Sequence, residues 1–426
     1  MAHRRPRKDQ QPSRGAPHVK RATVPTALEQ VHWHAAGIDV GATQHYVAVP
    51  EDRDAEPVRC VEAFTADLPR LADWLKTCGI DPVVMESTGV YWMPLFELLE
   101  QRGFEVLLVD ARHVKHVPGR NTDVLDCQWL QQLHTFGLLR GAFRPSDQVC
   151  VLRSYLRQQA NLVRCAAQHI QHMQTALTQM NLKLQHVVKD ITGKTGMAII
   201  QSILAGQRDP RQLATHRDHR CKHDEITIAK ALVGNYREEH LFELRQAVEL
   251  FNVYQAKITD CDTRIEAYLG TCADRSGGHA ISTRKRHQQC GRHAPAYDLR
   301  GHLDRISGVD LTRLDGLDAQ TGATVISEIG VDITAWPTVK HFCSWLGLCP
   351  GSKVTGGKNL SSRSKRSANR GAAALRLAAQ SLSNSASAMG AFYRRMKARL
   401  GPPKAITATA HRLARTIYAM LTEGRQ

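Results

Sequence analysis

The stretch "HAAGIDVGATQHYVAVP" (34–50) decides the fold of the N-terminal third of the chain. It holds two short apolar runs separated by Gly41, a pattern typical of two strands joined by a tight turn. Further along, helical and strand-like runs alternate: "LPRLADWLKTCGI" (68–80), "PVVME" (82–86), "WMPLFELLEQRG" (92–103) and "FEVLLVD" (104–110). We therefore predict an α/β domain with a mixed sheet over residues 31–147.

The region that follows, residues 148–270, has the spacing of long helices. Apolar residues step by threes and fours from Leu152 to Leu184, and a second row repeats every seven residues from Leu244 to Ile265. Such rows form a seam for a partner helix. The two helices could pair within one chain or between chains, and the seam could equally be ordinary core packing.

Positive charge is concentrated at the two ends of the chain. Residues 1–22 contain seven Lys and Arg against one acid, and residues 351–426 contain fifteen against one, within a total net charge of +17. A local excess of this kind favours a polyanion partner over simple solubility. We expect residues 1–30 to be a disordered basic arm, 271–302 a flexible basic linker, and 303–426 a mainly helical C-terminal domain.

Other classes of protein are disfavoured by composition. The chain has no run of eighteen apolar residues and its first residues are polar and basic, so we expect neither a membrane span nor a secretory signal. Its eleven cysteines include no C-x-x-C pair, which is typical of reduced thiols in the cytoplasm. Close His and Cys pairs, such as Cys221 and His223, lack a second pair at zinc-finger spacing.

Four acidic residues stand where a metal site could form. Asp39 and Glu86 each end an apolar strand, and Asp123 and Asp126 are three residues apart, on one face of a helix. Carboxylates in one cleft could hold two Mg²⁺ ions, with Mn²⁺ as an alternative, for in-line chemistry on a phosphodiester. Taken singly, these acids could equally be a turn residue, a surface acid and a helix cap.

The second candidate site is "GLCPGSKVTGGKNLSSRSKRSANRGAAALRLAAQS" (347–381), in which hydroxyl residues alternate with cations before an Ala-rich helix. Its basic residues are candidate phosphate contacts. They are Lys353, Lys358, Arg363, Lys365, Arg366 and Arg370. The hydroxyl groups are candidate nucleophiles, although such groups more often cap helices or contact phosphate.

These motifs resemble the insertion-sequence-110 transposases, and the resemblance covers nearly the whole chain. In the first half it rests on the segment around Asp39, "MESTGVYW" (85–92) and "NTDVLDCQWLQQLHTFGLL" (121–139). In the second half it rests on "PTVKHFCSWLGLCPG" (337–351), "TGGKNLSSRSKRSANRGAAALRLAA" (355–379) and "PKAITATAHRLARTIYAML" (403–421).

The resemblance implies an RNase H-like, RuvC-like first domain and a transposase that cuts and rejoins DNA. Its Asp-Glu-Asp-Asp metal site carries over onto Asp39, Glu86, Asp123 and Asp126. It also implies donor and target DNA, a bridge RNA encoded beside the gene, a nucleoid-associated location in the cytoplasm, and a dimer or tetramer whose composite site joins acids and hydroxyl from different chains.

The family's nucleophile is a serine directly before a glycine, and here that position is Thr355, followed by two glycines. Its extra methyl group restricts χ1 and crowds the approach to phosphorus. Ser352 and Ser361 are further hydroxyls of the same loop, and Asn121 stands where many relatives have lysine. Two other interpretations stay open: a metal-dependent junction nuclease without a covalent intermediate, and an inactive nucleic-acid-binding relative.

Overall fold

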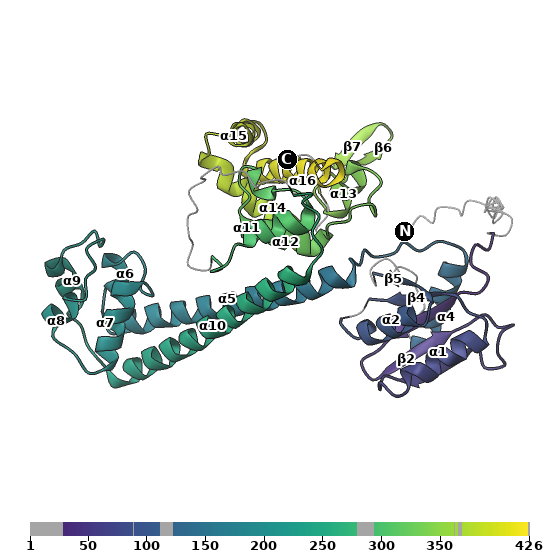
Figure 1. Ribbon diagram of the computed structural model, residues 1–426, viewed down its shortest axis with the longest axis horizontal. Coiled ribbons are helices and arrows are strands. Elements are labelled where there is room, and N and C mark those ends of the chain that lie inside the picture. The colour runs from purple at the N-terminus through teal and green to yellow at the C-terminus, as the bar shows by residue number, and fades with distance from the viewer. Residues whose placement is uncertain are drawn as a thin grey trace, which may run out of the picture. The chain divides into compact units, whose positions relative to one another are not determined.

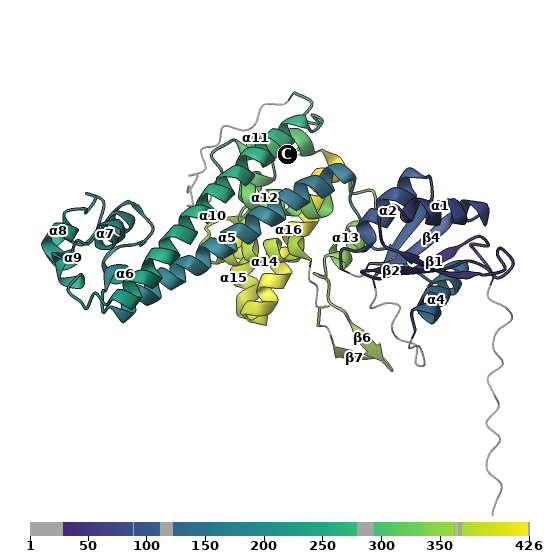
Figure 2. The same ribbon diagram turned by 90° about the horizontal axis from the view of Figure 1, so that it is seen from below.

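The computed structural model describes residues 29–87, 89–110, 122–278, 294–361, 363–364 and 369–424. The chain divides into two compact units, Met1–Arg144 and Pro145–Gln426, whose elements are labelled in Figures 1 and 2. The predicted arm (1–30) lies almost wholly outside the described residues, and so does about half of the predicted linker (271–302). The finer division of the second unit into three parts stays a prediction.

A five-stranded mixed sheet forms the first unit, in the order β3-β2-β1-β4-β5. The strands are β1 (Ala36–Val40), β2 (Gln44–Ala48), β3 (Val58–Glu62), β4 (Pro82–Glu86) and β5 (Glu105–Val109). Strand β2 is antiparallel to both of its neighbours, β1 and β3. Strand β4 runs parallel to β1, and β5 runs parallel to β4. The predicted mixed α/β sheet is confirmed, and its order is consistent with an RNase H-like fold.

Helices cover both faces of this sheet. Helices α1 (Leu68–Thr77) and α2 (Trp92–Gln101) bury Leu71 and Leu95 in one core with alternate residues of β1 and β4. Helix α4 (Asp123–Thr135) covers the other face, where Leu130 packs with Val84 and Val109. The sheet is therefore buried on both sides in its middle, as parallel strands require.

Two long helices, α5 (Asp147–Gln179) and α10 (Glu238–Thr271), form an antiparallel hairpin in the second unit and lie side by side in Figures 1 and 2. Near its open end, the Tyr268 hydroxyl donates to the Gln148 carbonyl at 2.8 Å. Further along, the Gln159 amide hydrogen-bonds to Asp262. The two predicted helical rows thus pair within one chain.

A small helical cluster closes the far end of this hairpin. It consists of α6 (Leu184–Val187), α7 (Lys194–Leu204), α8 (Pro210–Ala214) and α9 (Glu225–Ala231). Its apolar side chains share one core with both long helices, in which Met180, Ile200 and Leu244 are fully buried.

The C-terminal part of the second unit is mainly helical, as predicted. Its elements are α11 (Leu299–Ser307), η1 (Leu311–Arg313), α12 (Ala319–Ile329), α13 (Val339–Trp345), β6 (Lys353–Thr355), β7 (Lys358–Ser361), α14 (Arg370–Ser381), η2 (Leu382–Asn384), α15 (Ala388–Leu400) and α16 (Pro402–Glu423). Buried Phe342 anchors this part, since its ring lies against Trp336 and Tyr418. Among the described residues, no helix is long and apolar enough to cross a membrane.

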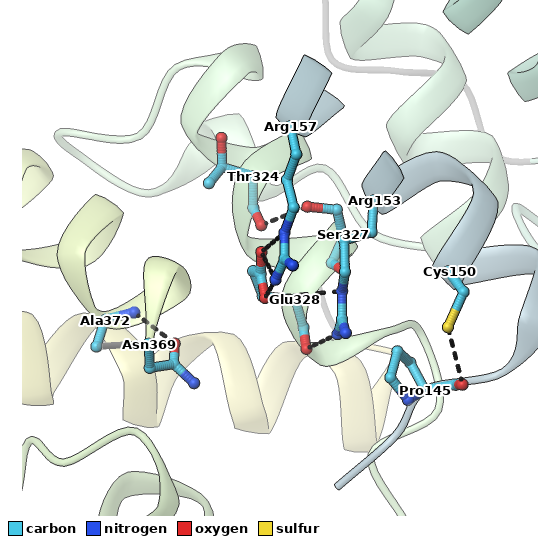
Figure 3. Close-up of polar contacts among 9 residues, drawn as sticks. All are labelled: Pro145, Cys150, Arg153, Arg157, Thr324, Ser327, Glu328, Asn369 and Ala372. Carbon is cyan, nitrogen blue, oxygen red and sulfur yellow. Dashed lines mark hydrogen bonds and ion pairs between the residues drawn. The ribbon is translucent and has the colours of Figure 1, made fainter. Parts of the chain in front are cut away.

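This C-terminal part is tied to the long hairpin by arginines. Arg305 of α11 donates to the Cys272 carbonyl, beyond the end of α10, at 2.6 Å. On the other long helix, Arg153 and Arg157 of α5 bind the end of α12 at Ser327 and Glu328, as Figure 3 shows. The C-terminal part is thus held to the hairpin by hydrogen bonds in which a cation is the donor.

Candidate functional site

Asp39 and Glu86 occupy neighbouring positions on adjacent parallel strands. In the pairing of β1 with β4, Ile38 lies opposite Met85, and the two acids are the next residues along their strands. Because adjacent strands are about 4.8 Å apart, the two acids stand side by side where the strands end. Glu86 is only 6% exposed and Asp39 is half-buried.

Both acids belong to the sheet face that α4 covers. Two residues before Asp39, a Cβ added to Gly37 would lie 2.3 Å from the Cys127 carbonyl oxygen of α4. Two residues before Glu86, Val84 packs against Leu130 of the same helix. Side chains two residues apart on a strand share a face, so Asp39 and Glu86 are directed to the α4 side.

Helix α4 begins at Asp123, because the Thr122 side chain caps it by accepting a hydrogen bond from the Leu125 amide. Asp123 is therefore the first helical residue and not the cap. It shares a stripe with buried Cys127 and Leu130, four and seven residues later. Asp126 lies in the same first turn, half-buried, whereas Asp123 is exposed.

Two neighbouring side chains respond to the charges of these acids. Burial raises the pKa of the Cys127 thiol to about 12, with the charges of Asp39 and, less strongly, Asp126 acting in the same direction. Tyr46 is the cross-strand partner of Asp39. Its pKa is raised first by a hydrogen bond with Cys60, and the charge of Asp123 adds to that effect. The acids of the sheet and of α4 therefore act on a shared region.

The donor chemistry of this region fits a hard divalent cation, since all four side chains offer carboxylate oxygens. Their grouping is looser than a finished metal site. Within the described part of the chain, no three side chains of His, Cys, Asp or Glu are gathered closely enough to hold an ion, zinc included. The acids would have to draw closer together around a cation.

Thr355 lies at the tip of a β-hairpin in the second unit. Strands β6 and β7 are antiparallel and pair Thr355 with Lys358 across a two-residue turn. The turn residues Gly356 and Gly357 have φ of 54° and 75°, values that glycine adopts without strain. Thr355 is exposed. The hairpin therefore presents its hydroxyl to solvent beside a cation.

This hairpin was not predicted from the sequence, although a Gly-Gly pair between two short alternating runs is a known signal for one. At its base the Gly351 amide donates to the Arg363 carbonyl at 3.0 Å. Ser352 is exposed, and the Ser361 hydroxyl accepts from the Arg363 amide.

Three of the candidate phosphate contacts have described side chains, on or beside this hairpin and at the start of the helix that follows it. Lys358 and Arg363 are exposed on the hairpin, and exposed Arg370 is the first residue of α14. Lys353 is in β6, but the structure does not describe its side chain. Lys365, Arg366 and Asn121 lie outside the described residues.

Two models of transposase families match this chain. Residues 36–182 match a family model of IS110-type DEDD transposases, described as "Transposase". Residues 310–394 match the model described as "Transposase IS116/IS110/IS902 family". The first range contains all four candidate acids and the second contains Thr355, and together they span more than half of the chain. No curated protein sequence matches this chain.

Proposed function

Because the chain belongs to the IS110 family of transposases, which carry out DNA strand transfer, we propose that it recombines DNA through the four acids and Thr355. The observation that carries this proposal is the placement of Asp39 beside Glu86 on the sheet face that α4 covers. We assign the first unit to the RNase H-like fold, in its RuvC-like form, because its strand order and its acidic strand ends agree with that fold.

We assign Asp39, Glu86, Asp123 and Asp126 as the ligands of divalent ions, with Mg²⁺ preferred and Mn²⁺ as a substitute. When bound, such ions would stabilise the attacking and the leaving oxygen of a phosphodiester. The acids contribute in two ways. Glu86 and Asp39 are fixed by the sheet, whereas Asp123 and Asp126 are carried by the first turn of α4, so a small movement of that turn adjusts the grouping.

The hydroxyl of Thr355 is the nucleophile in this proposal. Its Oγ1 forms a bond to phosphorus and loses its proton, the P–O bond to one strand end breaks, and the departing oxygen takes up a proton, so that this end leaves as a free hydroxyl. Rejoining reverses the step with another strand end. The turn at Gly356 and Gly357 supports this role because it leaves Thr355 exposed at the tip of a narrow arm. Cations of the segment 353–370 hold the adjacent phosphates.

Guidance and assembly are parts of the proposal that rest on the family resemblance. A bridge RNA, encoded beside the gene, would pair with donor and target DNA, and two or four chains would combine acids and hydroxyl in composite sites. The excess of positive charge over residues 351–426 is consistent with binding of both polyanions.

The proposal is tested with purified protein, Mg²⁺, RNA transcribed from the DNA that flanks the gene, and labelled DNA that carries an end of the element. Asp39→Asn should lower the rate of strand transfer about a thousandfold, which corresponds to a loss of about 4 kcal/mol in transition-state stabilisation. Thr355→Ala should abolish the protein–DNA link, whereas Thr355→Ser should keep it. Glu62→Gln, an exposed acid at the end of edge strand β3, is the matched control and should be neutral.

Peptide mapping of the trapped intermediate locates the link. Label on Thr355 supports the proposal, and label on Ser352 or Ser361 would reassign the nucleophile. Cleavage that survives Thr355→Ala but not Asp39→Asn would identify a metal-dependent nuclease without a covalent intermediate. Salt-sensitive binding of DNA and RNA without any strand break would identify an inactive relative.

A further inference from the structure

A large groove in the C-terminal part of the second unit begins at the base of the hairpin that carries Thr355, since Arg363 and Ser364 are in its lining. Its volume is about 1680 Å³, and it lies between α16, α15 and the segments around Thr338 and Pro350. Its main wall is one face of α16, from Lys404 through His411 to Arg415. His411 is seven positions after Lys404, and Arg415 is four positions after His411. The three residues therefore lie along about 17 Å of the helix.

The groove is strongly positive, and few acidic side chains neutralise its cations. Lys404, Arg412 and Arg415 are exposed, and none of them has an acidic partner at ion-pair distance in the part of the chain that the structure describes. The one acid of the lining, Glu423, stands at the last residue of α16. Exposed cations that lack acidic partners on a concave surface attract a polyanion.

An aromatic platform distinguishes this groove from a plain basic patch. The Arg412 guanidinium lies over the Phe392 ring of α15, 4.7 Å from the ring centroid. Arg395 lies 5.6 Å from the same centroid. A guanidinium that lies over a ring can stack against a nucleic-acid base while its N–H groups remain available to phosphate.

The side chains that line the groove beside this platform are small or uncharged. Thr407 and Ala408 lie between Lys404 and His411 on α16. Burial lowers the pKa of His411, and the positive charge of Arg415 adds to that effect. The His411 ring is therefore neutral at pH 7 and can accept a hydrogen bond from a base or a sugar. The groove thus combines a row of cations, a stacking surface and a neutral acceptor.

We propose that this groove binds an unpaired nucleic-acid strand, with Arg412 on Phe392 as the stacking platform and Lys404 and Arg415 as phosphate contacts. Stacking on side chains needs exposed base faces, which a continuous duplex does not offer. The inference rests on the proposed function, because cutting and rejoining strands produces unpaired segments. It places one of them along α16, in the groove that begins at the base of the Thr355 hairpin.

The test measures binding alone, in EDTA, so that it is independent of catalysis. The full chain is titrated into a fluorescent 15-nucleotide DNA strand, the RNA strand of the same sequence, and the corresponding DNA duplex. Arg412→Ala and Phe392→Leu should each weaken single-strand binding roughly five- to fiftyfold, as loss of base stacking does. Arg412→Lys, which keeps the charge, should lose most of the same affinity.

The matched control is Arg264→Ala, an exposed cation on α10, which should bind like the wild type. Lys404→Ala combined with Arg415→Ala should also reduce the slope of log affinity against log salt by about 1.4 for a single strand. Near-UV circular dichroism verifies that each variant is folded. Whichever of the DNA and RNA strands binds more tightly identifies the source of the strand.

Equal losses for Arg264→Ala and Arg412→Ala would overturn the proposal, as would a duplex that competes as well as either single strand. Wild-type affinity of Arg412→Lys would remove the stacking role. A variant that binds single strands normally but shows no strand transfer would contradict the proposed function and not the role of this groove. Failure of one proposal can therefore be told from failure of the other.

Discussion

Arg157 of α5 donates to both carboxylate oxygens of Glu328 of α12 at 2.9 Å, the central contact of Figure 3. The Glu328 side chain is 8% exposed. Arg153, one turn earlier on α5, donates to the backbone carbonyls of Ser327 and Glu328 and so satisfies the end of α12. The start of α14 rests on the same place, because a Cβ on Gly371 would lie 3.6 Å from the Glu328 Cβ. One buried acid thus connects α5, α12 and α14.

Replacing this acid should destabilise the second unit. Glu328→Ala leaves the Arg157 guanidinium without its acceptor and removes the 3.7 Å ion pair of Arg153, which keeps its bonds to the backbone carbonyls. We expect a loss of about 1–3 kcal/mol in the free energy of unfolding, moderated because Arg157 is partly exposed. Urea unfolding measures it.

A double-mutant cycle with Arg157→Ala isolates the pair and should give a coupling of about 1–2 kcal/mol. Arg264→Ala, at an exposed position on α10, serves as the control and should leave the unfolding midpoint unchanged. Additive effects of Glu328→Ala and Arg157→Ala would contradict the structural role assigned to this contact.

Gly37 should be indispensable because α4 touches the sheet there. A Cβ at this position would lie 2.3 Å from both the Cys127 carbonyl oxygen and the Gln131 amide nitrogen, and neither backbone atom can turn aside. Gly37→Ala must therefore push α4 away from β1, and with it Asp123 and Asp126 away from Asp39. We expect strand transfer to fall about a hundredfold or more.

The stability of the first unit should also fall by about 1–3 kcal/mol in this variant, as overpacking usually causes. Gly270→Ala is the control, since a Cβ on this residue near the end of α10 would meet no atom within 4 Å. It should keep full activity and gain slightly in stability. Wild-type activity in Gly37→Ala would show that the spacing of α4 and β1 has no effect on the reaction.

The sequence predicted the strands whose side chains are buried and missed those that are exposed. Strands β1 and β4 were found because apolar runs such as Val83–Met85 carry a clear signal. Edge strand β3 was missed, since Val58–Glu62 is only half-buried, and the hairpin was missed because Val354 and Leu360 are more than 60% exposed. An apolar pattern in the sequence reveals only strands whose side chains are buried.

The positions of the four candidate acids at two strand ends and one helix start were predictable, but their common face was not. That face depends on which side of the sheet α4 covers, and the contact of Gly37 with Cys127 joins residues ninety positions apart in the chain. No local pattern contains it. The metal-binding role of the four acids and the nucleophilic role of Thr355 stay predictions.

Cys127 should be inert in the folded protein. Its side chain is fully buried and its pKa is raised to about 12, chiefly by burial, so at pH 8 almost none of it is the reactive thiolate. Iodoacetamide at pH 8 should modify exposed Cys60 at least about a thousandfold faster. Mass spectrometry of peptides gives both rates, and unfolding in urea should make them equal. Equal rates in the folded protein would mean that α4 leaves the sheet readily.

Acid should destabilise the first unit through His134 on α4. This ring is 5% exposed, stacks on His32 at 4.6 Å, and its Nε2 has no hydrogen-bond partner in the described structure. Burial, and then the charge of His32, lowers its pKa from 6.5 to about 4. Above pH 6.5 the ring is neutral in both the folded and the unfolded chain. Between pH 6.5 and 4 only the unfolded chain takes up the proton, so stability is lost as the pH falls, and below pH 4 the loss is complete.

The loss should approach about 3 kcal/mol across that window, at 1.36 kcal/mol for each unit of pKa. Pulse proteolysis in urea at pH 7, 5.5 and 4 measures the free energy of unfolding of α4. His134→Leu is the decisive comparison, because it removes the titrating group and the unpaired nitrogen while other acids and histidines titrate as before. Its stability should therefore fall less between pH 7 and pH 4 than that of the wild type. Identical pH profiles for the two proteins would mean that His134 is protonated within the fold, and hence that α4 does not shield it from water.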